Sequence, residues 1–230
     1  MKDVIQIAGI IDEEESRMLV AEGVDYLGFP LRLRDGREDL SEIEAKRIIS
    51  SLGSYVSPVI ITYLDNAEEI AGFCRYMGVT KAQLHGPITT SEIEKLSKTS
   101  PRLFIVKSLI VRDNNLSELQ NLIGELSPYI GAYIMDTFDP ATGLSGATGK
   151  IHDWTVSRRI VEVSPKPVIL AGGLTADNVK DAILKVRPAG VDSHTGVEGT
   201  NGRKKQELVR KFVSEARKGF ELISTSVGKR

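Results

Sequence analysis

Cysteine is nearly absent from this sequence: among 230 residues, only Cys74 carries a thiol. A single cysteine excludes an intrachain disulfide and a zinc site built from several thiolates. A chain of this length should bury roughly 70% of its unfolded surface, so it needs no such cross-link. The low cysteine content favours a reducing, cytoplasmic setting. No feature of the sequence calls for a metal or an organic cofactor, and we expect none.

Long apolar runs and an excess of one charge are also lacking. No stretch approaches the about 20 apolar residues of a membrane span. The first apolar run is short and is followed at once by acidic residues, unlike a signal peptide. Lys and Arg number 30 and Asp and Glu number 31, so the formal charge is −1. We therefore expect no membrane and no nucleic acid as a partner, although the balance is compatible with a local anion site.

The sequence does contain an alternation of short β-type runs with amphipathic helical runs. Unbroken apolar runs such as 168–172 are typical of strands buried on both faces, as in parallel sheets. The expected strands are Val4–Ile7, Tyr26–Phe29, Val56–Thr62, Lys81–Leu84, Leu103–Lys107, Ala132–Met135, Pro167–Leu170 and Gly190–Asp192. The expected helices lie near 12–22, 41–51, 65–77, 90–98, 115–126, 154–163, 175–185 and 203–219.

Eight strand–helix pairs in 230 residues predict an α/β fold, a single-domain (β/α)8 TIM barrel. A doubly wound open sheet is the alternative, but no GxGxxG motif follows the first strand. We expect the barrel to span 1–223 and the polar tail 224–230 to fray. The sequence leaves open whether the protein is a monomer or a homodimer.

Two glycine-containing loops follow the last two expected strands, at 170–174 and 194–199. In this type of barrel, phosphate is usually bound at these two positions. Glycine allows the backbone to approach closely, and amides at the start of a helix can hold an anion. The other interpretation is that these glycines only form tight turns. The residues expected to bind phosphate are Gly172, Gly173, Gly196 and Val197.

An acidic residue, Asp136, directly follows the apolar run Ala132–Met135. At the mouth of a barrel, such a carboxylate can act as a general acid if its pKa is raised. Alternatively, it caps a turn. The loop that it begins, rich in Gly and Thr up to Lys150, could cover a ligand or lie on the surface.

An ordered set of short motifs extends nearly from end to end, from Ile5 to about Ala216. The motifs are Gly9-Ile10, Leu27-Gly28-Phe29, Gln83-Leu84-His85-Gly86, Asp136-Thr137, Gly146-Ala147-Thr148-Gly149-Lys150, Asp153-Trp154, Gly172-Gly173-Leu174, Asn178-Val179, Val186-Arg187-Pro188, Gly190-Val191-Asp192 and Gly196-Val197-Glu198. With these motifs the chain resembles phosphoribosylanthranilate isomerase, a barrel enzyme of tryptophan biosynthesis.

The resemblance implies an Amadori rearrangement, in which a phosphorylated aminoaldose opens its ring and becomes an aminoketose. In the family, a cysteine after the first strand takes the proton from C2. An aspartate after the sixth strand protonates the ring oxygen, and here it is Asp136. Arg37 matches an arginine near the anthranilate carboxylate, and we expect Gln83, His85 and Asp192 to contact the substrate. No cofactor or metal is implied, and the partner is a small phosphorylated molecule.

The sequence departs from the family at the catalytic base. The family pattern Lys-(Ile or Phe)-Cys-Gly reads Gln6-Ile7-Ala8-Gly9 here, and the Ala8 side chain cannot accept a proton. Losing a general base typically costs about 10²–10⁴-fold in rate. His194 follows the strand that should lie beside the first, and an ordinary imidazole pKa near 6.5 suits a replacement base. Alternatively, His194 binds a loop carbonyl or points to solvent.

Two basic features leave further alternatives open. Arg32, Arg34 and Arg37 lie in one loop and could grip a carboxylate or a second phosphate, unless the acids between them neutralise them on the surface. Lys107 could form a Schiff base, as in an aldolase. Three classes of function follow: a family isomerase with a substituted base, a different lyase or epimerase acting on a sugar phosphate, and a non-catalytic sugar-phosphate-binding or regulatory protein.

Overall fold

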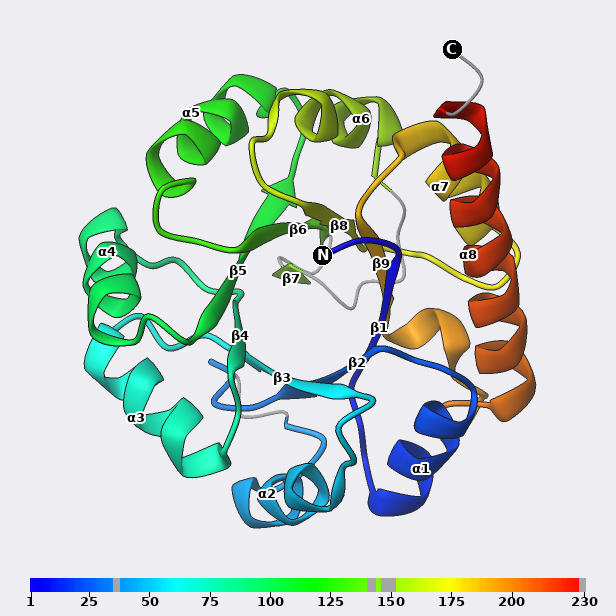
Figure 1. Ribbon diagram of the computed structural model, residues 1–230, viewed down its shortest axis with the longest axis horizontal. Helices are drawn as coiled ribbons and strands as arrows, with labels where there is room; N and C mark the ends of the chain where they lie inside the picture. Colours follow the sequence, from blue (N-terminus) through cyan, green and yellow to red (C-terminus); the bar gives the residue numbers. More distant parts are fainter. Residues whose placement is uncertain (35–37, 140–143, 146–151, 228–230) are drawn as a thin grey trace.

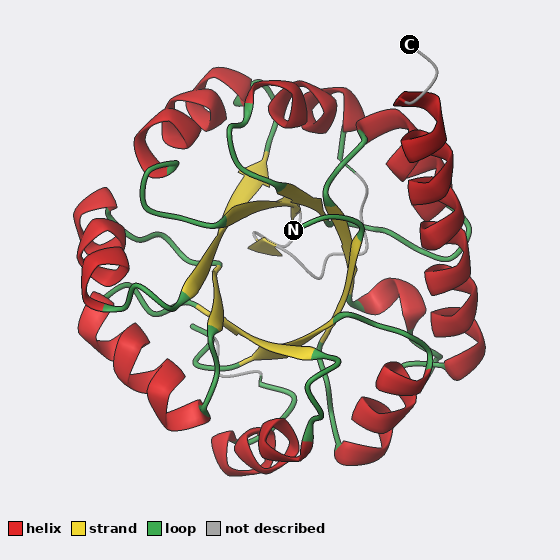
Figure 2. Ribbon diagram, in the orientation of Figure 1, coloured by secondary structure: helices red, strands yellow, loops and turns green. Residues whose placement is uncertain are grey.

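In the computed structural model, which describes residues 1–34, 38–139, 144–145 and 152–227, eight parallel strands surround a central axis and helices form a ring outside them (Figure 1, Figure 2). The barrel strands are β1 Val4–Ala8, β2 Tyr26–Pro30, β3 Ser57–Thr62, β4 Lys81–Leu84, β5 Phe104–Val111, β6 Ala132–Asp139, β8 Val168–Leu170 and β9 Gly190–Ser193. The helices are α1 Glu13–Ala21, α2 Glu42–Ser51, α3 Ala67–Met77, α4 Thr90–Thr99, α5 Leu116–Leu126, α6 Trp154–Val163, α7 Val179–Val186 and α8 Gln206–Val227.

The sheet closes on itself, which confirms the predicted barrel over the open sheet. Each strand pairs in parallel with the next, and the first strand β1 pairs with the last strand β9. In that pairing, Gln6 lies opposite Asp192. Closure brings residues from the two ends of the sequence together, so that loops after β1 and β9 are neighbours.

Helix starts follow from local hydrogen bonding. Ser41 forms the capping box that its spacing from Glu44 predicts. Asn66 caps α3 by accepting from two backbone amides. For α4 the Thr89 side chain accepts the Glu92 N–H, and Thr90 is the first helical residue.

Strands β5 and β6 extend further than the sequence predicts. Their ladder continues through the pair Ile110–Asp136, and the short strand β7, Leu144–Ser145, pairs antiparallel with the end of β6. Asp136 therefore lies within β6 rather than after it. Helix α8 also continues beyond the expected end at 219, through Val227.

The core has two layers. Ile5 and Ile7 of β1 belong to the large cluster between strands and helices, together with residues such as Leu19 of α1. A smaller cluster formed by Val106, Ala132, Ile134, Ile169 and Ala171 belongs to β5, β6 and the segment of β8. Since Ala132, Ile134 and Asp136 alternate along β6, all three share one face of the strand.

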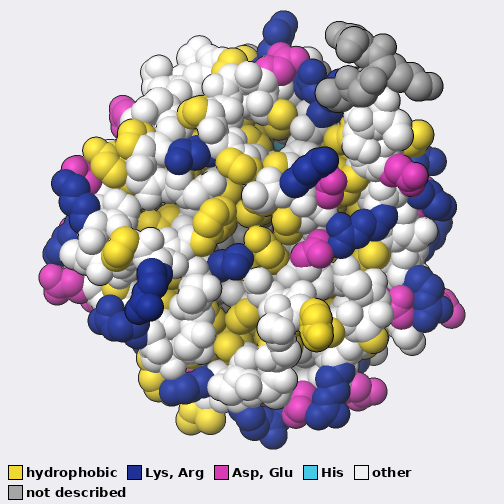
Figure 3. All heavy atoms as spheres, in the orientation of Figure 1, with side chains coloured by type: hydrophobic (Ala, Val, Ile, Leu, Met, Phe, Trp, Pro, Cys, Tyr) yellow, Lys and Arg dark blue, Asp and Glu magenta, His cyan; other side chains and the backbone are white. Residues whose placement is uncertain are grey.

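Outside the core, charged side chains of both signs interleave around the rim of the face in Figure 3, as the near-zero net charge leads one to expect. Within the described residues, no helix is both long enough and apolar enough to cross a membrane.

Candidate active site

The parallel barrel gathers the loops that follow its strands at one end. Gly9, Gly86, Gly173 and Gly196 each follow a strand, and Asp136 lies in the last half of β6. Because all barrel strands run in the same direction, these residues share the end where barrels of this type carry their chemistry.

A polar layer crosses the inside of the barrel below this end. The Gln6 side-chain amide donates to the Gln83 side-chain oxygen at 3.0 Å, and both residues are buried. Strands β1 and β4 are separated in the sheet by β2 and β3, so this bond spans the interior. Gln6 and Ala8 share the inner face of β1, and Asp192 is level with Gln6 on β9.

Asp136, the expected general acid, is a buried carboxyl group at this level. Its Oδ1 accepts the Thr137 N–H at 2.8 Å. Burial raises the pKa of Asp136, and the charge of His85 and the Thr137 hydrogen bond oppose this rise. A raised pKa favours the protonated carboxyl group, which is the state that an acid catalyst needs.

Asp192 is a second buried carboxylate. Burial, and then the nearby charge of Asp136, raises the pKa of Asp192 to about 7, while a Gln6 hydrogen bond and the Lys204 charge oppose the rise. Its Oδ1 is buried without a hydrogen-bond partner among the residues that the structure describes. The site therefore holds two carboxyl groups whose pKa values are both raised.

The two glycine loops lie side by side and need their glycines. Gly172 and Gly173 have φ values of +85° and +65°, a region that side chains disfavour. A Cβ at Gly196 would lie 1.9 Å from the Leu174 carbonyl oxygen. The Ser193 hydroxyl donates to that same carbonyl at 2.8 Å, which joins the loops. Val197 ends a short 3-10 turn, Thr195–Val197.

His194 lies over Gly9, the residue that follows Ala8. A Cβ on Gly9 would lie 2.0 Å from the His194 Nε2, so the imidazole covers the Gly9 Cα. Burial and then the charge of Lys204 lower the pKa of His194 to about 3. The expectation of an ordinary pKa near 6.5 is therefore wrong, because the ring is largely removed from water and faces a buried cation.

That cation belongs to a cluster that sequence reasoning missed. The Lys204 Nζ lies 2.6 Å from a Glu198 carboxylate oxygen, which is also 3.6 Å from the His194 Nε2. The Lys204 backbone N–H donates to Glu15. These contacts bind the loop after β9 to helix α1, which follows β1. Nothing in the sequence singles out Lys204 among 30 basic residues.

Gln6 stands where the family has a lysine, but sequence reasoning gives it no role, although a signal for one exists. It is the one polar residue in the strand sequence Val-Ile-Gln-Ile-Ala of β1, and it shares its face with Ala8. An inward polar residue two positions before a catalytic position is a candidate for the site.

Two basic residues of the site are held by neighbours. The His85 Nδ1 lies 3.0 Å from the Ser108 hydroxyl. The Lys107 Nζ donates to the carbonyls of Leu84, Gly86 and Ser108 at 3.0–3.2 Å. Burial lowers the pKa of Lys107 to about 8. All three ammonium protons have acceptors, so the lone pair that a Schiff base requires is not available.

The basic loop is only partly described. Arg37, the expected carboxylate contact, and Gly146–Lys150 of the family motif lie outside the described residues. Arg32 pairs with Glu42 at 2.8 Å and stacks over the Phe73 ring. Arg32 thus has an acidic neighbour, as the surface interpretation of this loop expects.

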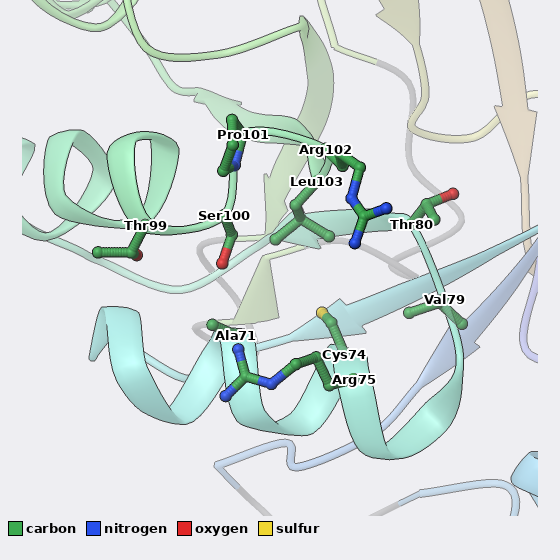
Figure 4. A pocket seen from close by; sticks show the side chains of 10 residues that line it. All are labelled: Ala71, Cys74, Arg75, Val79, Thr80, Thr99, Ser100, Pro101, Arg102 and Leu103. Carbon is green, nitrogen blue, oxygen red and sulfur yellow. The ribbon is translucent and has the colours of Figure 1, made fainter.

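The lone cysteine is far from this end. Cys74 of α3 lines a cavity of about 420 Å³ with Arg75 and with residues 99–103, which lead into β5 (Figure 4). Since Thr80 and Leu103 precede β4 and β5, the cavity lies at the opposite end of the barrel. Burial raises the pKa of the Cys74 thiol to about 11. Cys74 therefore cannot replace the missing base.

No group of three or more His, Cys, Asp or Glu in the described ranges is arranged to hold a metal ion. Fold and site together define a (β/α)8 barrel with two glycine loops after its last strands and buried carboxyl groups at its mouth. Residues 5–215 match the family model of N-(5′-phosphoribosyl)anthranilate (PRA) isomerase. The chain belongs to this family.

Known proteins agree with the assignment. The chain is 38% identical over 220 residues to N-(5′-phosphoribosyl)anthranilate isomerase 2 of Methanosarcina mazei, covering 94% of this chain and 95% of that protein. The phosphoribosyl anthranilate isomerase of Thermotoga maritima superposes with a TM-score of 0.79 at 26% identity, covering 94% and 98%. The N-(5′-phosphoribosyl)anthranilate isomerase of Pyrococcus furiosus superposes with a TM-score of 0.76 at 28% identity, and the same shares of the two chains are covered.

Proposed function

We propose that this protein is an aldose–ketose isomerase that converts a phosphorylated aminoaldose, phosphoribosylanthranilate or a close analogue, into the aminoketose. The observation that carries the proposal is the buried carboxyl group of Asp136, with its raised pKa, at the same end as the two glycine loops. The family match over 5–215 supports the same reaction.

The roles follow from this geometry. Asp136 holds a proton and delivers it to the ring oxygen as the bond between C1 and that oxygen breaks. The amides of Gly172, Gly173, Gly196 and Val197 bind the phosphate, and Gln83, His85 and Asp192 contact the sugar. Arg37, from the loop after β2, binds the carboxylate of the substrate. His194 is the base that the sequence predicts, but its lowered pKa makes the imidazole a weak one.

The alternative classes of function receive less support. The three carbonyl partners of Lys107 argue against a Schiff-base lyase. A non-catalytic binding protein would have no use for a buried, proton-holding carboxyl group at the mouth of the barrel. The partner of the protein is then a small phosphorylated substrate, and the protein works as a monomer or homodimer without a cofactor.

Turnover of phosphoribosylanthranilate by the purified protein tests the proposal. We expect the wild type to convert it and Asp136→Asn to lose about 10²–10⁴-fold in kcat, because the amide cannot donate the catalytic proton. Both proteins should retain binding of ribose 5-phosphate, measured by thermal shift. Binding without any conversion by the wild type would favour the non-catalytic class instead.

A further inference from the structure

The structure lacks a proton acceptor where the family has its thiol. Ala8 ends β1 on the inner face, and its methyl group cannot take up a proton. The three other candidates are poorly suited: Cys74 is at the opposite end, Lys107 donates all its protons to carbonyls, and His194 is a weak base. An isomerase with this site still needs a group that removes the C2 proton.

Asp192 is placed to supply that group. It lies on β9, the strand that pairs with β1, directly opposite Gln6 and hence diagonal to Ala8 on the same inner face. Diagonal neighbours in paired strands have Cα atoms about 7–8 Å apart, within reach of an aspartate side chain and a small ligand between them.

Asp192 has one polar side chain level with it and one oxygen left open. Gln6 lies opposite Asp192 in the strand pairing, where its amide favours the ionised carboxylate, and Gln83 holds Gln6 across the barrel at 3.0 Å. The other oxygen, Oδ1, is buried and unpartnered within the described part of the chain. An unsatisfied buried carboxylate oxygen is costly unless a ligand completes it. Asp136 is close enough to Asp192 that ionisation of one carboxyl group disfavours ionisation of the other.

Resting on the proposed function, we infer that Asp192 is the general base of this enzyme and that Gln6 is the residue that positions it. After Asp136 has opened the ring, C1 is doubly bonded to nitrogen as an iminium. Asp192 Oδ1 takes the proton from C2, and the electron pair of that C–H bond forms the C1=C2 bond. The C1=N pair returns to nitrogen, giving an enolamine. C1 then gains a proton and the C2 hydroxyl loses one, which gives the ketone.

The test compares variants in the assay for phosphoribosylanthranilate turnover. We expect Asp192→Asn to lose on the order of 10²–10⁴-fold in kcat while its KM changes much less. Adding Ala8→Cys to Asp192→Asn supplies a different base in the adjacent position and should recover much of the rate. The matched control is Ala8→Cys added to Asp136→Asn, which should recover nothing because the acid is still missing.

A pH profile gives an independent readout. The wild-type rate should rise with pH through about 7, the pKa of Asp192, because only the carboxylate accepts a proton. Asp192→Glu, which keeps a carboxylate, should retain a rising limb at a lower rate, and Asp192→Asn should lose it. Gln6→Ala should shift the apparent pKa of the rising limb of the pH–rate profile. If Gln6 served only in packing, that apparent pKa would stay unchanged.

Three outcomes separate the failures. Full turnover by Asp192→Asn would overturn the assignment of Asp192 as the base. Loss of turnover in His194→Ala but not in Asp192→Asn would do the same. Either result would leave the proposed isomerase function standing. An Asp192→Asn protein that binds ribose 5-phosphate normally but is not rescued by Ala8→Cys would show that Asp192 binds substrate rather than acting as base. Absence of turnover in the wild type would overturn the proposed function itself, and the assignment with it.

Discussion

The carboxyl group of Asp192 should have a measurable thermodynamic cost. Burial and the neighbouring Asp136 raise its pKa from an ordinary 3.8 to about 7 in the folded protein. The folded chain therefore holds this proton at pH values where the unfolded chain has released it. By linkage, the contribution of Asp192 to stability is most favourable below about pH 4 and is lost as the pH rises to about 7.

Replacing Asp192 by asparagine removes this dependence. Relative to wild type, Asp192→Asn should gain on the order of 1–3 kcal/mol of unfolding free energy between pH 5 and pH 8. Denaturant unfolding at both pH values measures the gain, with the exposed Asp113→Asn as a control expected to show none. An equal difference at both pH values would mean that the carboxyl group titrates normally.

At the scale of single elements, the loop after β9 depends on the absence of a side chain. A Cβ at Gly196 would meet the backbone oxygen of Leu174 at 1.9 Å, so Gly196→Ala must displace one loop from the other. We expect at least about tenfold weaker binding of ribose 5-phosphate, or about 1.4 kcal/mol, measured by titration.

The matched control is Gly124→Ala in α5. No atom lies within 4 Å of a Cβ there, and alanine favours a helix by about 1 kcal/mol over glycine. This variant should bind ribose 5-phosphate as the wild type does. Unchanged affinity in Gly196→Ala would show that the loop after β9 does not contact the phosphate.

The elements themselves were largely predictable from the sequence, because apolar periodicity and caps such as Ser41 act locally. The extra length of β5 and β6 was not predictable from the sequence, since it depends on the pairing of β5 with β6 and of β6 with β7. The same distinction between local signals and contacts of distant segments applies to the residues of the site. Asp136 directly follows an apolar run and can be found from the sequence. The pKa of His194 depends on Lys204, whose approach only the folded loops reveal.

At the scale of the whole molecule, the last helix closes the ring. Helix α8 lies beside both α7 and α1 (Figure 1). Arg217 of α8 pairs with Asp25 at 2.8 Å, and Asp25 accepts the backbone N–H of Ile5 in β1 at 2.7 Å. The C-terminal helix thus stabilises the first strand, which carries Gln6 and Ala8 of the site.

Phe212, in the middle of α8, is fully buried in the main core. Phe212→Ala leaves a cavity and should lower the unfolding free energy by about 3–5 kcal/mol, a large share of the about 5–15 kcal/mol of a typical domain. Fluorescence of Trp154, the single tryptophan, follows denaturant unfolding. Leu222→Ala on the same helix is the control, because Leu222 is 51% exposed and its truncation should cost much less. If both variants lose the same small amount, α8 is packed more loosely than its buried face implies, and the barrel closes without it.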